Sequence, residues 1–120
     1  MLPTLSSSSV KIISLNRDQL LTRLRQIASR LQKEHPEVAE VRLFGSLARG
    51  DQTGTSDVDI LIVLQHTLER DPHRRILTYL PYFDLRQGAD CLVYTRAELE
   101  RLSADNRFLQ RIWEESLPLI

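Results

Sequence analysis

The chain has 120 residues, of which 42% are hydrophobic and 27% charged, values typical of one compact globular domain and not of a disordered or fibrous chain. Sixteen basic and sixteen acidic side chains give a formal net charge of zero, so the basic excess of proteins that bind long nucleic acids is missing and we expect no DNA partner. A single cysteine, Cys91, excludes an internal disulfide, and no apolar run is long enough to span a bilayer, so we expect a cytoplasmic protein without a membrane contact.

The N-terminal part predicts a long amphipathic helix after a short lead-in. Residues 1–14 contain Pro3 and four consecutive serines, and we expect them to be a flexible lead-in to a single domain over residues 15–120. Apolar side chains then recur with helical spacing over residues 17–33, which gives this helix one buried face. Pro36 disfavours helical backbone at the preceding residue and should end the helix before it.

Two strands follow, joined by a helical turn and a polar loop. Residues 38–44 alternate between two faces as a strand does, and Gly45 should end that strand. Residues 46–49 predict one short helical turn, and residues 51–56 predict a loop. Residues 57–64 (DVDILIVL) predict the second strand, which is apolar on both faces beyond its first residues and therefore belongs in the centre of a sheet.

The C-terminal half alternates helices and strands. Thr95 and Glu98 have the spacing of a capping box at a helix start, and Arg74 with Arg75 should lie on a solvated helix face. The expected elements are helices at 72–80, 96–102 and 105–115, a strand at 89–94 and a short edge strand at 117–120. This order predicts an α/β fold, an α+β sandwich in which a small mixed sheet of about three or four strands packs against helices.

Asp57 and Asp59 form the first chemical feature. Side chains alternate along a strand, so these two carboxylates project from the same face, opposite Val58. Two carboxylates held this close repel each other unless a cation neutralises them. Mg²⁺ commonly binds through one or two carboxylates together with substrate phosphates. The pair therefore predicts part of a metal site for phosphoryl chemistry.

Gly45 and Ser46 predict the complementary part. A strand that ends in glycine and continues into a helical turn presents free backbone N–H groups and a hydroxyl, which together favour an anion. Glycine also allows a phosphate to approach the backbone closely. We call the turn that begins with Gly45 and Ser46 the phosphate turn. Arg49 either adds a positive charge to this turn or points into solvent.

A third carboxylate is expected on a neighbouring strand, because a two-metal site needs more oxygen ligands than one aspartate pair provides. Asp90 lies at the start of the strand at 89–94 and fits this position. Asp84, in a turn-like segment after Pro81, is the alternative.

The stretch GSLARGDQTGTSDVD, a glycine-serine pair followed after ten residues by DxD, resembles the signature of the DNA polymerase beta-like nucleotidyltransferase superfamily. With the later strand ADCLVY, the chain looks most similar to the minimal nucleotidyltransferase (MNT) domains over about residues 17–117. The resemblance implies the nucleotidyltransferase fold. It also implies transfer of a nucleoside monophosphate, which agrees with the lack of a P-loop pattern for γ-phosphates.

The resemblance assigns a role to each of these residues. It implies that Gly45 and Ser46 hold the β- and γ-phosphates of a nucleoside triphosphate, with Arg49 as a further nucleotide-binding candidate. It implies that Asp57 and Asp59 coordinate a pair of Mg²⁺ ions. Asp90 would bind the catalytic metal and help to deprotonate the attacking hydroxyl. The displacement at the α-phosphorus would then release pyrophosphate.

The resemblance also implies a partner. Many MNT proteins are encoded beside a helical HEPN ribonuclease and act as its antitoxin by transferring AMP from ATP to a tyrosine of that toxin. The expectation is therefore a Mg²⁺-dependent protein adenylyltransferase with a HEPN toxin as partner. Two alternatives stay open: a non-catalytic antitoxin that acts by complex formation, and a nucleotidyltransferase for small molecules such as aminoglycosides. No separate nucleobase-binding domain is visible, so the partner or a second copy in a homo-oligomer could complete the nucleotide pocket.

Overall fold

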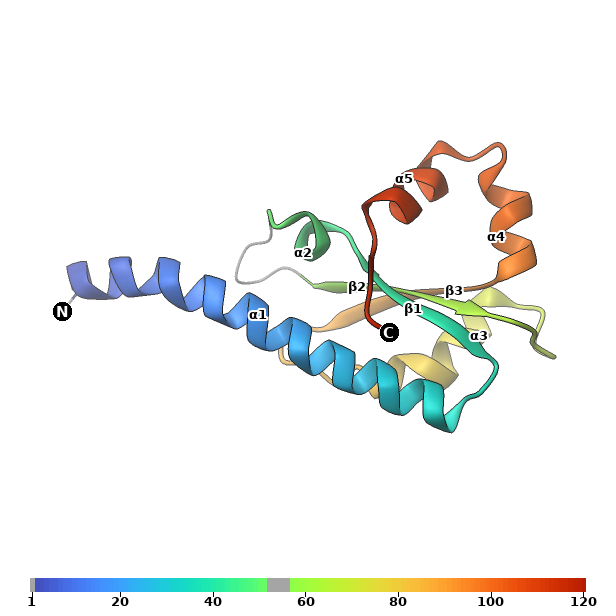
Figure 1. Cartoon of the computed structure of the whole chain (residues 1–120), viewed down its shortest axis with the longest axis horizontal. Coiled ribbons are helices and arrows are strands. Elements are labelled where there is room, and N and C mark those ends of the chain that lie inside the picture. Colours follow the sequence, from blue (N-terminus) through green and yellow to red (C-terminus); the bar gives the residue numbers. More distant parts are fainter. Residues whose placement is uncertain (1, 52–56) are drawn as a thin grey trace.

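The computed structural model describes residues 2–51 and 57–120, with side chains from residue 17 onward. A four-stranded mixed sheet has helices on both faces, as the sequence predicts for an α/β sandwich (Figure 1). None of the helices in the described residues combines the length and the hydrophobicity needed to cross a membrane. The elements are α1 (Leu2–Glu34), β1 (Val38–Phe44), α2 (Ser46–Arg49), β2 (Val58–Leu64), α3 (Pro72–Tyr79), the 3₁₀ helix η1 (Leu80–Tyr82), β3 (Ala89–Thr95), α4 (Arg96–Ser103), α5 (Arg107–Glu115) and β4 (Leu117–Pro118).

The strand order in the sheet is β3-β2-β1-β4. β1 runs antiparallel to both β2 and β4, whereas β2 and β3 are parallel. The apolar strand β2 therefore lies inside the sheet, and the short strand β4 lies at its edge, as predicted. In this register Asp59 has Phe44 of β1 on one side and Asp90 of β3 on the other.

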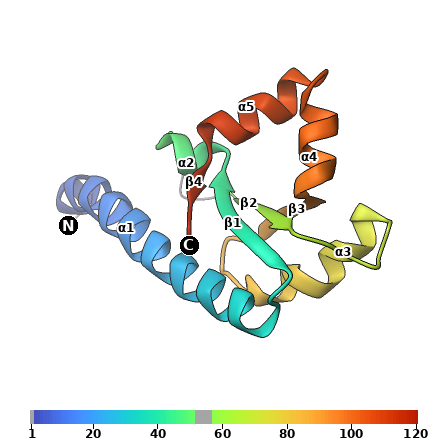
Figure 2. The same cartoon turned by 45° about the vertical axis from the view of Figure 1, so that its right-hand side comes forward.

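The two faces of the sheet build two separate hydrophobic clusters. Val58, Ile60 and Ile62 of β2 belong to the larger cluster, which also contains the buried stripe of α1. Leu61 and Val63 point the other way and pack with buried residues of α5. Figure 2 shows α1 and α3 on one side of the sheet and α4 and α5 on the other. Asp59 shares its face with Leu61 and therefore lies on the side of α4 and α5.

The first helix differs from the expectation, because α1 begins at Leu2. The sequence predicts a flexible lead-in over residues 1–14 and a helix start near Arg17, but residues 2–16 are helical. Pro3 lies in the first turn, where its missing N–H needs no helical partner. Residues 4–34 contain neither glycine nor proline, so no residue in the rest of α1 interrupts the backbone hydrogen bonds. The N-terminal half of α1 extends beyond the sheet (Figure 1).

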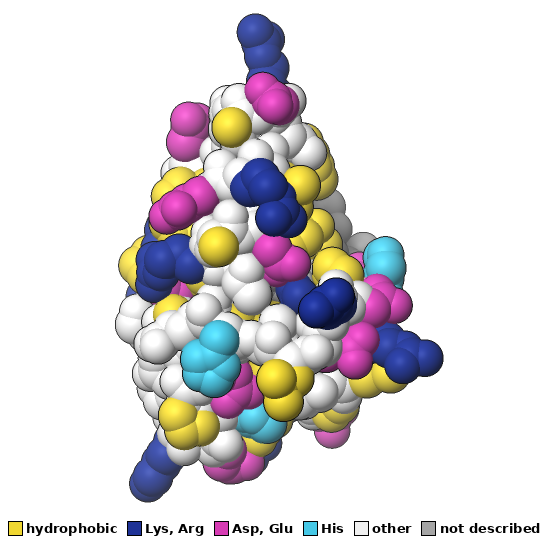
Figure 3. All heavy atoms as spheres, turned by 90° about the vertical axis from the view of Figure 1, so that its right-hand side faces the viewer, with side chains coloured by type: hydrophobic (Ala, Val, Ile, Leu, Met, Phe, Trp, Pro, Cys, Tyr) yellow, Lys and Arg dark blue, Asp and Glu magenta, His cyan; other side chains and the backbone are white. Residues whose placement is uncertain are grey.

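The surface around α3 and α4 carries charges of both signs. Figure 3 shows acidic, basic and histidine side chains interspersed with apolar ones on this face. A continuous basic stripe of the kind that follows a nucleic-acid backbone is absent from the part of the face that is described.

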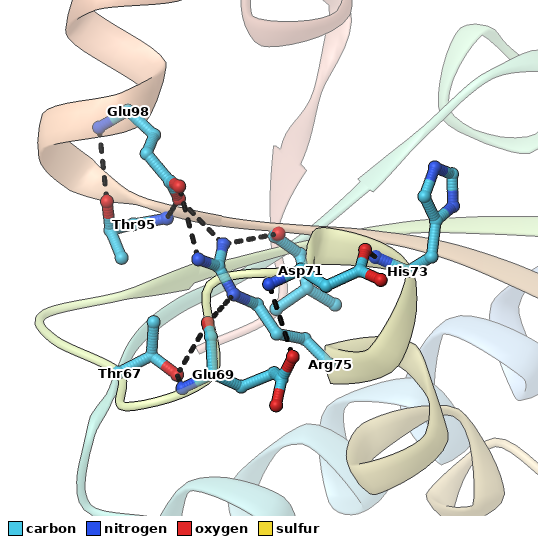
Figure 4. A network of polar contacts seen from close by, with 8 residues as sticks. Thr67, Glu69, Asp71, His73, Arg75, Thr95 and Glu98 are labelled. Atoms are coloured by element: carbon cyan, nitrogen blue, oxygen red, sulfur yellow. Dashed lines mark hydrogen bonds and ion pairs between the residues drawn. The ribbon is translucent and has the colours of Figure 1, made fainter.

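The predicted position of Arg75 on a solvated helix face is wrong, because its side chain is buried. Its guanidinium donates to the backbone oxygens of Glu69 and Val93 at 2.8 and 3.2 Å, and to Glu98 Oε1 at 2.6 Å and Oε2 at 3.1 Å (Figure 4). Glu98 also completes the predicted capping box with Thr95 at the start of α4. This network ties α3 to the end of β3 and to α4.

We expect Arg75→Leu to lower the free energy of unfolding by about 3–5 kcal/mol, because it leaves the largely buried Glu98 carboxylate without its cation. The pKa of Glu98 is lowered from 4.5 to about 2, and the hydrogen bond from Arg75 is the largest cause of this shift. The stabilisation from this pair is therefore complete above pH 4.5 and decreases as the pH falls toward 2. Urea unfolding at pH 7 and pH 3 measures both effects.

The matched control is Arg74→Leu, on the exposed side of the same helix. It should change the free energy of unfolding by no more than about 0.5 kcal/mol. Equal losses in the two arginine variants would contradict a structural role for the Arg75–Glu98 pair.

Candidate active site

Three carboxylates lie at the end of the sheet where β2 and β3 begin, those of Asp57, Asp59 and Asp90. Asp59 and Asp90 are direct partners in the parallel β2–β3 ladder, so their side chains leave the same face. Asp57 comes immediately before β2, and the next N–H, that of Val58, donates to the Gly88 oxygen at 3.1 Å. This bond fixes the start of β2 beside the loop that leads into β3. The structure thus pairs Asp59 with Asp90, and places Asp57 two residues before Asp59 at the start of the same strand.

The electrostatics of Asp59 reflect this grouping. Burial raises the pKa of its carboxyl, and the charges of Asp90 and Asp57 raise it further. The positive charge of Arg49 acts in the opposite direction. Asp59 therefore ionises against the repulsion of two neighbours, which a divalent cation would relieve.

The donor set fits Mg²⁺, because it consists of carboxylate oxygens alone. In the described residues no three side chains of His, Cys, Asp or Glu are gathered closely enough to hold a metal ion by themselves. A Mg²⁺ ion here would take further ligands from water and from substrate phosphates, as it commonly does.

Asp84, the alternative third carboxylate, lies elsewhere. It is exposed and lines a surface hollow of about 380 Å³ together with Arg23, Arg30 and Tyr82. The carboxylates that raise the pKa of Asp59 are Asp90 and Asp57, and Asp84 is not among them. The structure therefore places Asp90, and not Asp84, beside Asp59.

Gly45 lies directly against Asp59. Its backbone has φ 78° and ψ −160°, a conformation that is essentially reserved for glycine. A Cβ atom at this position would overlap Asp59 Oδ2. Glycine thus lets β1 end within contact distance of Asp59, one of the three aspartates (Asp57, Asp59 and Asp90) that we call the acidic cluster. The chain then turns into α2.

α2 is a single helical turn that begins at Ser46. The Gly45 oxygen accepts from the Arg49 N–H at 3.1 Å, and the Ser46 oxygen accepts from the Gly50 N–H at 2.9 Å. The N–H groups of Ser46, Leu47 and Ala48 precede the first intrahelical bond and have no helical acceptor. The predicted phosphate turn therefore lies beside the predicted metal ligands.

Arg49 does not simply point into solvent in this structure, and its predicted contact with a phosphate stays a prediction. Its side chain is about half exposed, but its Nε lies 3.1 Å from Asp51 Oδ2 and its Nη1 lies 3.2 Å from Glu115 Oε2. Both carboxylates raise the pKa of Arg49. Arg49 is thus held by acidic side chains near the cluster.

Sequence reasoning missed two residues that support this turn. Arg17 of α1 donates from Nε and Nη2 to the Leu47 oxygen at 3.3 and 3.2 Å, which occupies a backbone oxygen of the short helix α2. Glu115, at the end of α5, pairs with Arg49 across 66 residues of sequence. A single sequence carries no signal for either contact, because both depend on how distant elements pack.

The sequence model of the family described as "Nucleotidyltransferase domain" matches residues 24–120. The chain belongs to this nucleotidyltransferase family. The predicted superfamily is thereby confirmed, and the fold and the enzyme class with it.

Two proteins of Methanocaldococcus jannaschii are similar to this nucleotidyltransferase, and both carry provisional names as protein adenylyltransferases. MJ1215 is 29% identical over 86 residues, which cover 69% of this chain and 90% of the relative. MJ0128 is 30% identical over 89 residues, which cover 73% of this chain and 82% of the relative.

Solved structures show the same fold. A provisionally assigned nucleotidyltransferase from Sulfolobus solfataricus superposes with a TM-score of 0.59 and 30% identity, over 71% of this chain and 75% of that one. A structure described as a toxin-antitoxin with AMP-PNP gives a TM-score of 0.53 over 80% of this nucleotidyltransferase and 72% of that chain. At 20% identity the second likeness concerns the fold alone.

Proposed function

We propose that this nucleotidyltransferase uses Mg²⁺ and ATP to transfer AMP to a hydroxyl group of a partner protein. The observation that carries the proposal is the pairing of Asp59 with Asp90 across β2 and β3, directly beside Gly45. The names of the two relatives from M. jannaschii support a protein as the acceptor.

In the proposed reaction Asp57, Asp59 and Asp90 would hold the metal ions, and Asp90 accepts the proton of the attacking hydroxyl. Mg²⁺, when bound, supplies positive charge that stabilises the attacking and leaving oxygens. The N–H groups at the start of α2, which have no helical acceptor, bind the β- and γ-phosphates together with the Ser46 hydroxyl. A bond forms between the hydroxyl oxygen and the α-phosphorus, the bond from that phosphorus to its bridging oxygen breaks, and pyrophosphate leaves.

The partner in the proposal is a helical toxin of the HEPN type, with this chain as its antitoxin. The fold shared with a toxin-antitoxin structure supports a toxin as the partner.

Incubation with each of the four α-labelled nucleoside triphosphates, Mg²⁺ and host lysate tests the proposal. We expect label from ATP on one protein band, and no label with Asp57→Asn, because that variant removes a carboxylate from the metal site. Label on a small molecule would contradict a protein acceptor. Neutralisation of a toxin by Asp57→Asn without ATP would favour the non-catalytic antitoxin instead.

A further inference from the structure

Arg49 is the positive side chain of the phosphate turn, yet two carboxylates already hold it. Its Nε donates to Asp51 Oδ2 at 3.1 Å, and its Nη1 donates to Glu115 Oε2 at 3.2 Å. The local group of one guanidinium and two carboxylates has a net negative charge. Arg49 can therefore give a bound phosphate the N–H groups that now face Asp51 and Glu115 only by releasing these acids.

Glu115 is held in place at the end of α5. The next residue, Ser116, is buried, and its hydroxyl accepts from Arg42 Nε at 2.6 Å, while its backbone oxygen accepts from Arg42 Nη2 at 3.3 Å. The Arg42 guanidinium also lies 4.4 Å from the centre of the Trp113 ring. Because Arg42 belongs to β1, the strand that carries Gly45, the end of α5 has a fixed position relative to the phosphate turn.

The ion pair between Arg49 and Glu115 lies close to the acidic cluster. α5 covers the sheet face from which Asp59 projects. The positive charge of Arg49 offsets part of the rise in the pKa of Asp59, which places the guanidinium within electrostatic range of the cluster. A triphosphate bound at the start of α2 would meet Arg49 and Glu115 together, one attractive and one repulsive.

We propose that Glu115 is a positioning residue that restrains Arg49 in the nucleotide-free chain and so weakens triphosphate binding, since the phosphate must compete with the Glu115 carboxylate for the Arg49 guanidinium. This inference rests on the proposed function and extends it to the control of nucleotide affinity. It also couples the end of α5 to the nucleotide site. Any contact that draws Glu115 away from Arg49 would then raise the affinity for nucleotide.

The test measures binding of inorganic triphosphate with Mg²⁺ by titration calorimetry. Glu115→Gln should bind it about two- to fivefold more tightly than the parent chain, the range of a partly exposed ion pair. The KM for ATP should fall by a similar factor, with kcat changed less than about twofold, because the released arginine acts on binding and not on the α-phosphorus. The matched control is Glu114→Gln, on the same helix and exposed, which should bind as the parent does.

The Arg49→Gln background decides whether Glu115 acts through Arg49. There, Glu115→Gln should tighten triphosphate binding by a smaller factor than in the parent chain, because only the direct repulsion between Glu115 and the phosphate is left to remove. Unchanged or weaker binding in the single variant would overturn the inference, and so would equal tightening with and without Arg49. Equal melting temperatures of the variants exclude a folding effect. Triphosphate binding without transfer of any nucleotide would refute the proposed function but leave this inference standing.

Discussion

Asp59→Asn should reduce nucleotide transfer by at least about 10²–10³-fold, the loss expected when a central electrostatic group of an active site is removed. The same change should make the nucleotide-free chain more stable at neutral pH. Both effects have one cause: Asp59 is partly buried between Asp57 and Asp90, a position that favours a bound cation and disfavours the free carboxylate. Transfer assays and urea unfolding at pH 7 measure the two effects.

The sign of the pH dependence of folding stability follows from the raised pKa of Asp59. A carboxyl whose pKa is higher in the folded chain than in the unfolded chain favours folding while it is protonated, below its ordinary value of 3.8. This contribution disappears as the pH rises through the raised value. The parent chain should therefore lose stability over a window that begins near pH 3.8 and extends upward, and Asp59→Asn should lose less there.

Asp105→Asn provides the comparison, because Asp105 is exposed in the turn between α4 and α5. It should leave transfer and stability close to those of the parent. Wild-type activity in Asp59→Asn, or a clear loss of stability at pH 7, would contradict the proposed site.

Gly45→Ala should impair both folding and transfer. Its backbone conformation costs a residue with a side chain about 1–3 kcal/mol, and the added methyl group would overlap the Asp59 carboxylate. The Asp59 side chain would have to move from its place beside Asp90, so we expect activity to fall further than stability alone explains. Denaturant unfolding and nucleotide transfer, measured on the same preparations, separate these contributions.

Gly50→Ala is a control at a second glycine with positive φ, where an added Cβ meets no overlap. Gly50 also has a positive φ, of 84°, but a Cβ there would meet nothing within 4 Å. It should cost about 1–2 kcal/mol of stability and leave the transfer rate of the folded fraction nearly unchanged. If the two alanine variants lost activity equally, close contact between Gly45 and Asp59 would not be needed for function.

The sequence predicts the elements around the site well because their signals are local. A glycine ends β1, a two-residue period puts Asp57 and Asp59 on one face, and Thr95 with Glu98 caps α4. These features depend on neighbouring residues and on backbone geometry. The start of α1 is the exception, since a serine-rich segment without glycine forms helix as readily as an irregular lead-in.

Contacts between distant elements were much harder to predict. The order of elements suggested Asp90 as the third carboxylate, but only the parallel register of β2 and β3 separates it from Asp84. Arg75 has the same local pattern as its exposed neighbour Arg74, yet it is buried because Glu98 and two backbone oxygens meet it there. The pairing of Arg49 with Glu115 likewise depends on how α5 packs on the sheet.

The central claim is that the three aspartates and the phosphate turn form one metal-dependent site for nucleotidyl transfer. Parallel incubations of the chain and its partner proteins with α-labelled and γ-labelled ATP test it most directly, with Mg²⁺ and with a chelator. The account predicts protein-bound label from α-labelled ATP alone, only with Mg²⁺. Protein-bound label from γ-labelled ATP, or transfer that persists in the chelator, would contradict it.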